Sequence, residues 1–125
     1  MPRDAVAEAA VDSWDVAPLP VDGAPERVFE HRIEADHRGW CSVAVVNRDL
    51  GLRLEVAWDA RTLPRLHQWL HPATGVSVLG IEPANCSVLG RASDRAAGTL
   101  PMLSPGAART TTMTLRATVV RVTTG

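Results

Sequence analysis

One carboxylate stands out in residues 75–86, which read GVSVLGIEPANC. Residues 76–81 are apolar and rich in β-branched side chains between a glycine and a proline, so they predict a buried strand. Glu82 follows that strand directly and precedes Pro83. An acid at the point where a buried strand opens into a loop is a candidate general base, and the alternative is a loop acid exposed to water.

The composition sets the broad class of the protein. The chain has 125 residues, of which 46% are hydrophobic, and this suits one small globular domain with its own core. The net charge is −1 and the basic residues are scattered, so the basic surface of a nucleic-acid-binding protein is missing. No segment approaches the roughly 18 to 20 apolar residues that span a membrane, and no signal peptide is evident. We therefore expect a cytoplasmic protein that binds neither nucleic acid nor membranes.

The two cysteines, Cys41 and Cys86, are too few for a disulfide framework in a chain of this length. No CxxC pair indicates zinc. Both thiols are expected to be reduced, and no metal site is predicted.

Several segments have the pattern of β-strands. Residues 27–31 alternate, residues 40–47 form an apolar run that ends in a turn signal, and we expect these two strands to be neighbours. After the turn at residues 47–51, alternation from Leu52 to Trp58 predicts the second strand of an antiparallel hairpin. In that strand Leu52, Leu54, Val56 and Trp58 are expected to face the core, and Arg53 and Glu55 the solvent.

The remaining segments complete an all-β chain. Residues 65–71 lie between prolines and favour an extended segment over a helix, and residues 87–102 predict a loop with one helical turn. Residues 110–123 predict a long last strand. Residues 1–25 carry several prolines and predict a poorly packed lead-in to a domain that spans residues 26–125. Five or six strands without a long helix predict an antiparallel β-sandwich.

A family resemblance is carried by a series of motifs along the chain. They run VxN, GLxLEV, TLPxLxQW, GVxVLGIEPANC and GxLPxLxPG, followed by a threonine-rich strand. Over roughly residues 12 to 122 the chain resembles the C-terminal part of aldose 1-epimerase (galactose mutarotase)-like proteins, and more narrowly their DUF4432-type branch. The resemblance implies part of a large antiparallel β-supersandwich. Since members are commonly more than twice this length, it also implies the last portion of such a domain.

The resemblance implies a role for Glu82. Family mutarotases use a glutamate on a late strand as base, in a GFxxExQ motif that is followed by a Pro-Gly turn, and a histidine from an earlier strand as acid. Gly80, Ile81 and Glu82 stand at the place of that motif, so Glu82 inherits the role of the base. Pro83 and Ala84 replace the segment that carries the family's glutamine, and no histidine here has the context of the family's acid.

The implied reaction interconverts the anomers of a hexose or a hexose derivative. A base removes the proton of the anomeric hydroxyl while an acid protonates the ring oxygen, so that the ring opens and closes on the other face. The reaction needs no cofactor. Histidine suits the acid's task because its ordinary pKa lies near 6.5, and His67 or His71 could approach Glu82.

Further side chains each have two interpretations. Trp69 is a stacking platform for a sugar ring or a core residue. Asn85 binds a sugar hydroxyl or caps the turn after Pro83. Arg91 binds a hydroxyl, carboxylate or phosphate, or pairs with Asp94 on the surface. His67 is a ligand of the sugar or a structural histidine.

Three interpretations of the whole chain follow. It is a carbohydrate isomerase with Glu82 as base, a carbohydrate-binding β-module without catalysis, or a truncated family member. In each case the partner is a sugar, and exposed sheet edges could join copies of the chain into a homo-oligomer.

Overall fold

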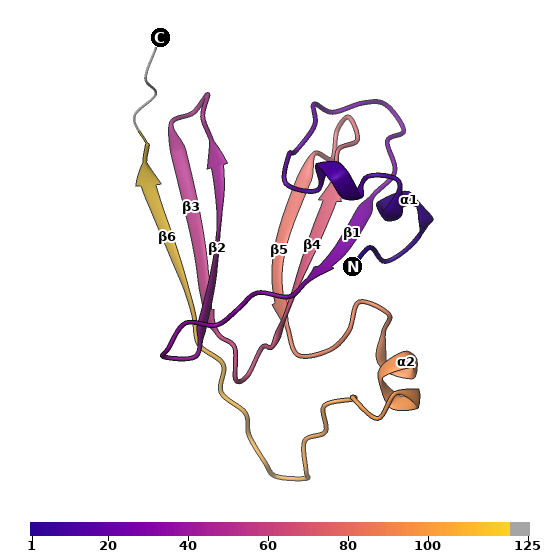
Figure 1. Ribbon diagram of the computed structural model, residues 1–125, viewed down its shortest axis with the longest axis vertical. Coiled ribbons are helices and arrows are strands. Elements are labelled where there is room, and N and C mark those ends of the chain that lie inside the picture. Colours follow the sequence, from indigo (N-terminus) through magenta and orange to yellow (C-terminus); the bar gives the residue numbers. More distant parts are fainter. Residues whose placement is uncertain (121–125) are drawn as a thin grey trace.

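The computed structural model describes residues 1–120 and contains two three-stranded antiparallel sheets (Figure 1). One sheet has the strand order β1-β4-β5, formed by β1 (Arg27–His31), β4 (Arg65–His71) and β5 (Val78–Ala84). The other has the order β2-β3-β6, formed by β2 (Trp40–Asn47), β3 (Leu52–Asp59) and β6 (Met113–Val119). The prediction of an all-β antiparallel sandwich is confirmed.

The β2–β3 hairpin forms as its sequence predicts. Asn47 pairs with Leu52, and Cys41 pairs with Trp58. The side chain of Asn47 accepts a hydrogen bond from the backbone N–H of Leu50, at 2.9 Å. Gly51 has a φ of 62°, a conformation that is easily reached without a side chain. The turn therefore fixes the register that the alternation of β3 requires.

The expectation that residues 27–31 and 40–47 pair with each other is wrong. β1 pairs with β4, and the chain crosses to the opposite sheet before β2 begins. A turn in this crossing is held by Asp36, whose carboxylate accepts hydrogen bonds from the backbone N–H groups of Arg38 and Trp40, each at 2.9 Å. These two bonds, that of Trp40 above all, hold the pKa of Asp36 below its ordinary value.

The core lies where side chains from both sheets meet. Trp58 of β3 is 1% exposed and packs with Cys41, Val56 and Leu66. Its indole N–H donates to the backbone carbonyl of Leu63 at 2.9 Å, so the polar atom of this buried ring is satisfied. Since Leu66 belongs to β4, this cluster joins the two sheets.

Away from this cluster the facing sides of the sheets are less well covered. Leu52 and Leu54 lie on the core-facing side of β3 as predicted, but they remain 45% and 43% exposed. They line a cavity of about 350 Å³ between the sheets, together with Leu79 of β5 and Leu115 of β6. Figure 1 shows the two sheets spreading toward the top of the view.

The N-terminal segment lies against the β1-β4-β5 sheet. It contains α1 (Ala5–Glu8) and the short 3-10 helix η1 (Val11–Ser13). Most of its residues are exposed, but Ala7 is fully buried. Pro2 forms a bridge with Phe29 of β1, and the backbone carbonyl of Trp14 accepts a hydrogen bond from Gln68 at 2.8 Å.

The segment between β5 and β6 contains α2 (Arg91–Ala96), which confirms the predicted helical turn. The last strand was predicted over residues 110–123 and forms over Met113–Val119. Residues 121–123 of that prediction lie outside the described residues.

Candidate functional site

Three ionisable side chains form a row across the β1-β4-β5 sheet. Glu30 of β1 lies opposite His67 of β4, and His67 lies opposite Glu82 of β5. Side chains alternate between the faces of a strand, and the neighbouring Leu66 and Ile81 pack into the core. The three ionisable side chains, called here the polar row, therefore lie on the face of the sheet that points away from the core.

Glu82 lies inside β5, although the sequence suggested the point where a strand opens into a loop. The strand continues through Pro83 to Ala84. β5 tolerates this proline because it is an edge strand and does not need every backbone N–H for pairing. The Glu82 side chain is exposed, so a ligand can reach its carboxylate from solvent.

Gly80 leaves room for that carboxylate. A Cβ atom added to Gly80 would stand 2.5 Å from Oε1 of Glu82 and 3.3 Å from Cβ of Trp69. The Glu82 side chain thus folds back along its own strand over Gly80, next to Trp69. The glycine that precedes Glu82 by two residues is part of the site for this reason.

His67 is the histidine that the structure brings next to Glu82. It is 8% exposed, and Nε2 is its buried nitrogen. His71 belongs to the same face but lies opposite Val78, further along β4. Of the two histidines, the strand register thus places His67 opposite Glu82.

Trp69 lies on the same face as the polar row. Its indole N–H donates to Oε2 of Glu26 at 2.9 Å, and its ring centroid lies 6.3 Å from that of His71. The carboxylate of Glu26 is also bound by Arg3, and the Arg3 hydrogen bond is the main reason that the pKa of Glu26 lies below its ordinary value. Trp69 is half-buried outside the main core, so part of its ring is open to solvent.

Asn85 and Arg91 do not join the polar row. Asn85 is exposed and follows the last residue of β5, while Arg91 is exposed at the start of α2. Neither forms a hydrogen bond or ion pair with Glu82 or His67 in the described part of the chain. Their proposed contacts with a sugar stay predictions.

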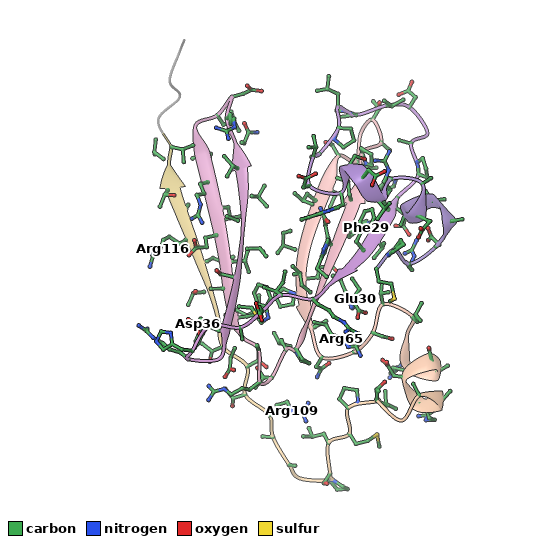
Figure 2. All side chains as sticks on the ribbon, in the orientation of Figure 1. Phe29, Glu30, Asp36, Arg65, Arg109 and Arg116 are labelled. Atoms are coloured by element: carbon green, nitrogen blue, oxygen red, sulfur yellow. The ribbon has the colours of Figure 1, made fainter. Side chains whose placement is uncertain are left out.

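Two residues of this face were not singled out from the sequence. Glu30 is 7% exposed, and one of its carboxylate oxygens accepts a hydrogen bond from the guanidinium of Arg65 (Figure 2). The signal was present in the alternation of β1, where Glu30 follows Phe29, a fully buried residue of the other face. A buried acid in an alternating strand indicates a partner on the neighbouring strand.

The loop between β5 and α2 contacts Glu30, the buried end of the polar row. Asp94 of α2 is 2% exposed, and its carboxylate accepts hydrogen bonds from the backbone N–H of Ser87 at 3.0 Å and from the hydroxyl of Thr99 at 3.1 Å. The Ser87 backbone bond is the main cause that keeps the pKa of Asp94 below its ordinary value. Asp94 thereby fixes the loop in which the backbone N–H of Val88 reaches Oε2 of Glu30, at 3.3 Å.

This arrangement can exchange protons with a ligand. An exposed carboxylate and an imidazole lie opposite each other on adjacent strands, beside a partly exposed tryptophan. Within residues 1–120, no group of three or more His, Cys, Asp or Glu side chains is placed to hold a metal ion. Among the same residues, no helix is long and apolar enough to cross a membrane.

Comparison with known proteins places the chain in a protein family. The model of a family described as "Domain of unknown function (DUF4432)" matches residues 1–117, and so includes β1 to β5 and most of β6. No curated protein and no solved structure matches the chain.

Proposed function

This chain belongs to the DUF4432 family, and from that premise we propose that it is an aldose 1-epimerase-like isomerase, which interconverts the anomers of a hexose or hexose derivative. The observation that carries the proposal is the direct pairing of His67 with Glu82 across adjacent strands. A second support is the space over Gly80, which lets the Glu82 carboxylate lie beside Trp69.

In the proposed reaction Glu82 is the base. It takes the proton of the anomeric hydroxyl, while His67 gives a proton to the ring oxygen, and the bond between the anomeric carbon and the ring oxygen breaks. The carbonyl group then rotates. The ring closes on the other face as His67 takes back the proton and Glu82 returns one to the new anomeric hydroxyl. Trp69 offers its ring face to the apolar C–H patch of the sugar.

Polarimetry of freshly dissolved α-glucose and α-galactose tests this function. We expect the wild-type protein to accelerate mutarotation above the buffer rate, and Glu82→Gln to lower the enzymatic rate by about 100-fold or more, because the amide cannot act as a base. Glu34→Gln is the matched control, since Glu34 is an exposed acid between β1 and β2. Equal rates for wild type and Glu82→Gln would contradict the proposal.

A carbohydrate-binding module without catalysis is the second candidate. It is favoured by one observation, the burial of Nε2 of His67 away from solvent, which removes one ring nitrogen from contact with a ligand. In that case titration calorimetry would detect saturable sugar binding, weakened by Trp69→Ala, while polarimetry would show no acceleration by the wild type.

A further inference from the structure

His67 faces a second carboxylate on the side opposite Glu82. Nε2 of His67 lies 3.5 Å from Oε2 of Glu30, and the two side chains are 8% and 7% exposed. Nε2 has no hydrogen-bond partner within residues 1–120. A buried polar nitrogen that lacks a hydrogen-bond partner is costly, and the Glu30 carboxylate is an acceptor that lies close to it. Contacts of this length often shorten when a substrate binds.

Glu30 is itself held in place from two directions. Its Oε1 accepts from the guanidinium of Arg65, which is two residues before His67 on β4. Its Oε2 accepts from the backbone N–H of Val88, at 3.3 Å. The carboxylate therefore cannot turn away from His67 without losing one of these bonds. Figure 2 shows Glu30 and Arg65 close together at one end of the sheet.

We infer that Glu30 is a positioning residue for His67. Glu30 accepts the proton on Nε2 and thereby leaves Nδ1 as the nitrogen that exchanges a proton with the sugar ring oxygen. The proton balance is complete, because an imidazolium that gives up its Nδ1 proton becomes the neutral tautomer with the proton on Nε2, which is the tautomer that Glu30 stabilises. Glu82 stays free to act as the base on the other side of His67.

The inference rests on the proposed function, so its test uses one measurement with sugar and one without. By polarimetry with α-galactose, Glu30→Gln should lower kcat by about 10- to 100-fold and leave KM within about twofold, as is typical when an orienting partner is lost. Glu34→Gln is again the control of equal charge change, and it should match the wild type in both constants.

The measurement without sugar is proton and nitrogen NMR of the histidine rings at a pH where they are neutral. In the wild type the His67 ring should carry its proton on Nε2, and this proton should exchange slowly with water and resonate downfield. Glu30→Gln should move that signal upfield, and His67→Gln should remove it, which assigns it. This measurement does not depend on enzymatic activity. The position of the proton in the wild type can be determined even if a variant fails to fold.

The outcomes separate the two claims. An active wild type whose kcat is unchanged by Glu30→Gln would overturn the positioning role and leave the isomerase intact. A His67 proton on Nδ1 in the wild type would overturn the positioning role by itself. A wild type with no mutarotase activity would overturn both the function and the catalytic part of the inference.

Discussion

At the scale of single residues, Gly80 matters because it has no side chain and so leaves space for the Glu82 carboxylate. Its φ does not lie in the left-handed region, so glycine is not required there by the backbone. It is required by Oε1 of Glu82, which would stand 2.5 Å from any Cβ at this position. The flexible carboxylate can move to relieve such a contact, so the cost falls on the placement of Glu82 more than on the fold.

The change Gly80→Ala should therefore separate activity from stability. We expect mutarotation by the variant to fall by about tenfold or more, because the base is displaced. The free energy of unfolding should change by no more than about 1 kcal/mol, because the restriction of the unfolded chain by alanine opposes the close approach of the new Cβ to Cβ of Trp69, at 3.3 Å. Urea unfolding measures the stability, and polarimetry on folded protein from the same preparation measures the activity. A variant with full activity would show that Glu82 does not act from the position over Gly80.

Asp94 gives a residue-scale prediction for pH. Its pKa lies below the ordinary value because the folded chain supplies hydrogen bonds from Ser87 and Thr99. A carboxyl whose folded pKa is lowered stabilises the protein above its unfolded pKa of about 3.9, and this contribution is lost as the pH falls through the folded pKa.

The measurement compares the Tm of wild type and Asp94→Asn at pH 7 and pH 3. The variant should melt several degrees lower at pH 7, and the gap should be narrower at pH 3, because the stabilisation by the carboxylate already declines once the pH falls below its unfolded pKa. The comparison with the variant is needed because other acids with lowered pKa, such as Asp36 and Asp59, also contribute to acid unfolding. A gap that stays constant between the two pH values would contradict the role of the Asp94 charge.

At the scale of elements, local patterns predicted strands well but predicted their partners poorly. The β2–β3 hairpin could be read from alternation and a turn because its two strands are adjacent in the chain. The pairing of β1 with β4 joins strands that are separated by a complete hairpin, and no local pattern encodes such a contact. The assumption that consecutive strands pair failed there.

The residues of the candidate site also differ in how far the sequence alone could identify them. Glu82 could be identified from its strand and from the family resemblance, and His67 from its neighbours in sequence. Glu30 could not, because its importance depends on the β1–β4 register that places it opposite His67. Arg65 depends on the same register through its hydrogen bond with Glu30.

The two ends of β3 should contribute unequally to the stability of the protein. Trp58 and Leu54 lie on the same face, but Trp58 is 1% exposed and Leu54 is 43% exposed. Trp58→Ala should lower the free energy of unfolding by about 3–5 kcal/mol, since it removes the largest side chain of the cluster that joins the sheets. Leu54→Ala should cost about 1 kcal/mol or less. Urea unfolding followed by circular dichroism measures both, and equal losses would contradict the position of the core.

At the scale of the whole molecule, the outer edge of the β2-β3-β6 sheet is exposed along the whole of β6. All seven residues of β6 are exposed, and within residues 1–120 no strand pairs with its outer edge. On the side that faces the other sheet, Leu115 and Val119 are 71% and 84% exposed. An exposed edge strand is a template for pairing with another chain, and the only charged side chain of β6 is Arg116. The chain has no lysine that could oppose such pairing.

We therefore expect copies of the protein to associate through β6, the proposed route to a homo-oligomer. Antiparallel pairing of two β6 strands would satisfy the free backbone groups and shield Leu115. Sedimentation velocity over a range of concentrations should show a mass that rises with concentration in the wild type and stays at the monomer value in Leu115→Lys, since lysine on an edge opposes pairing. The control is Leu50→Lys in the exposed β2–β3 turn, which makes the same change at a 69% exposed leucine. If the wild type is a monomer throughout, or if Leu50→Lys dissociates it equally, β6 is not the contact.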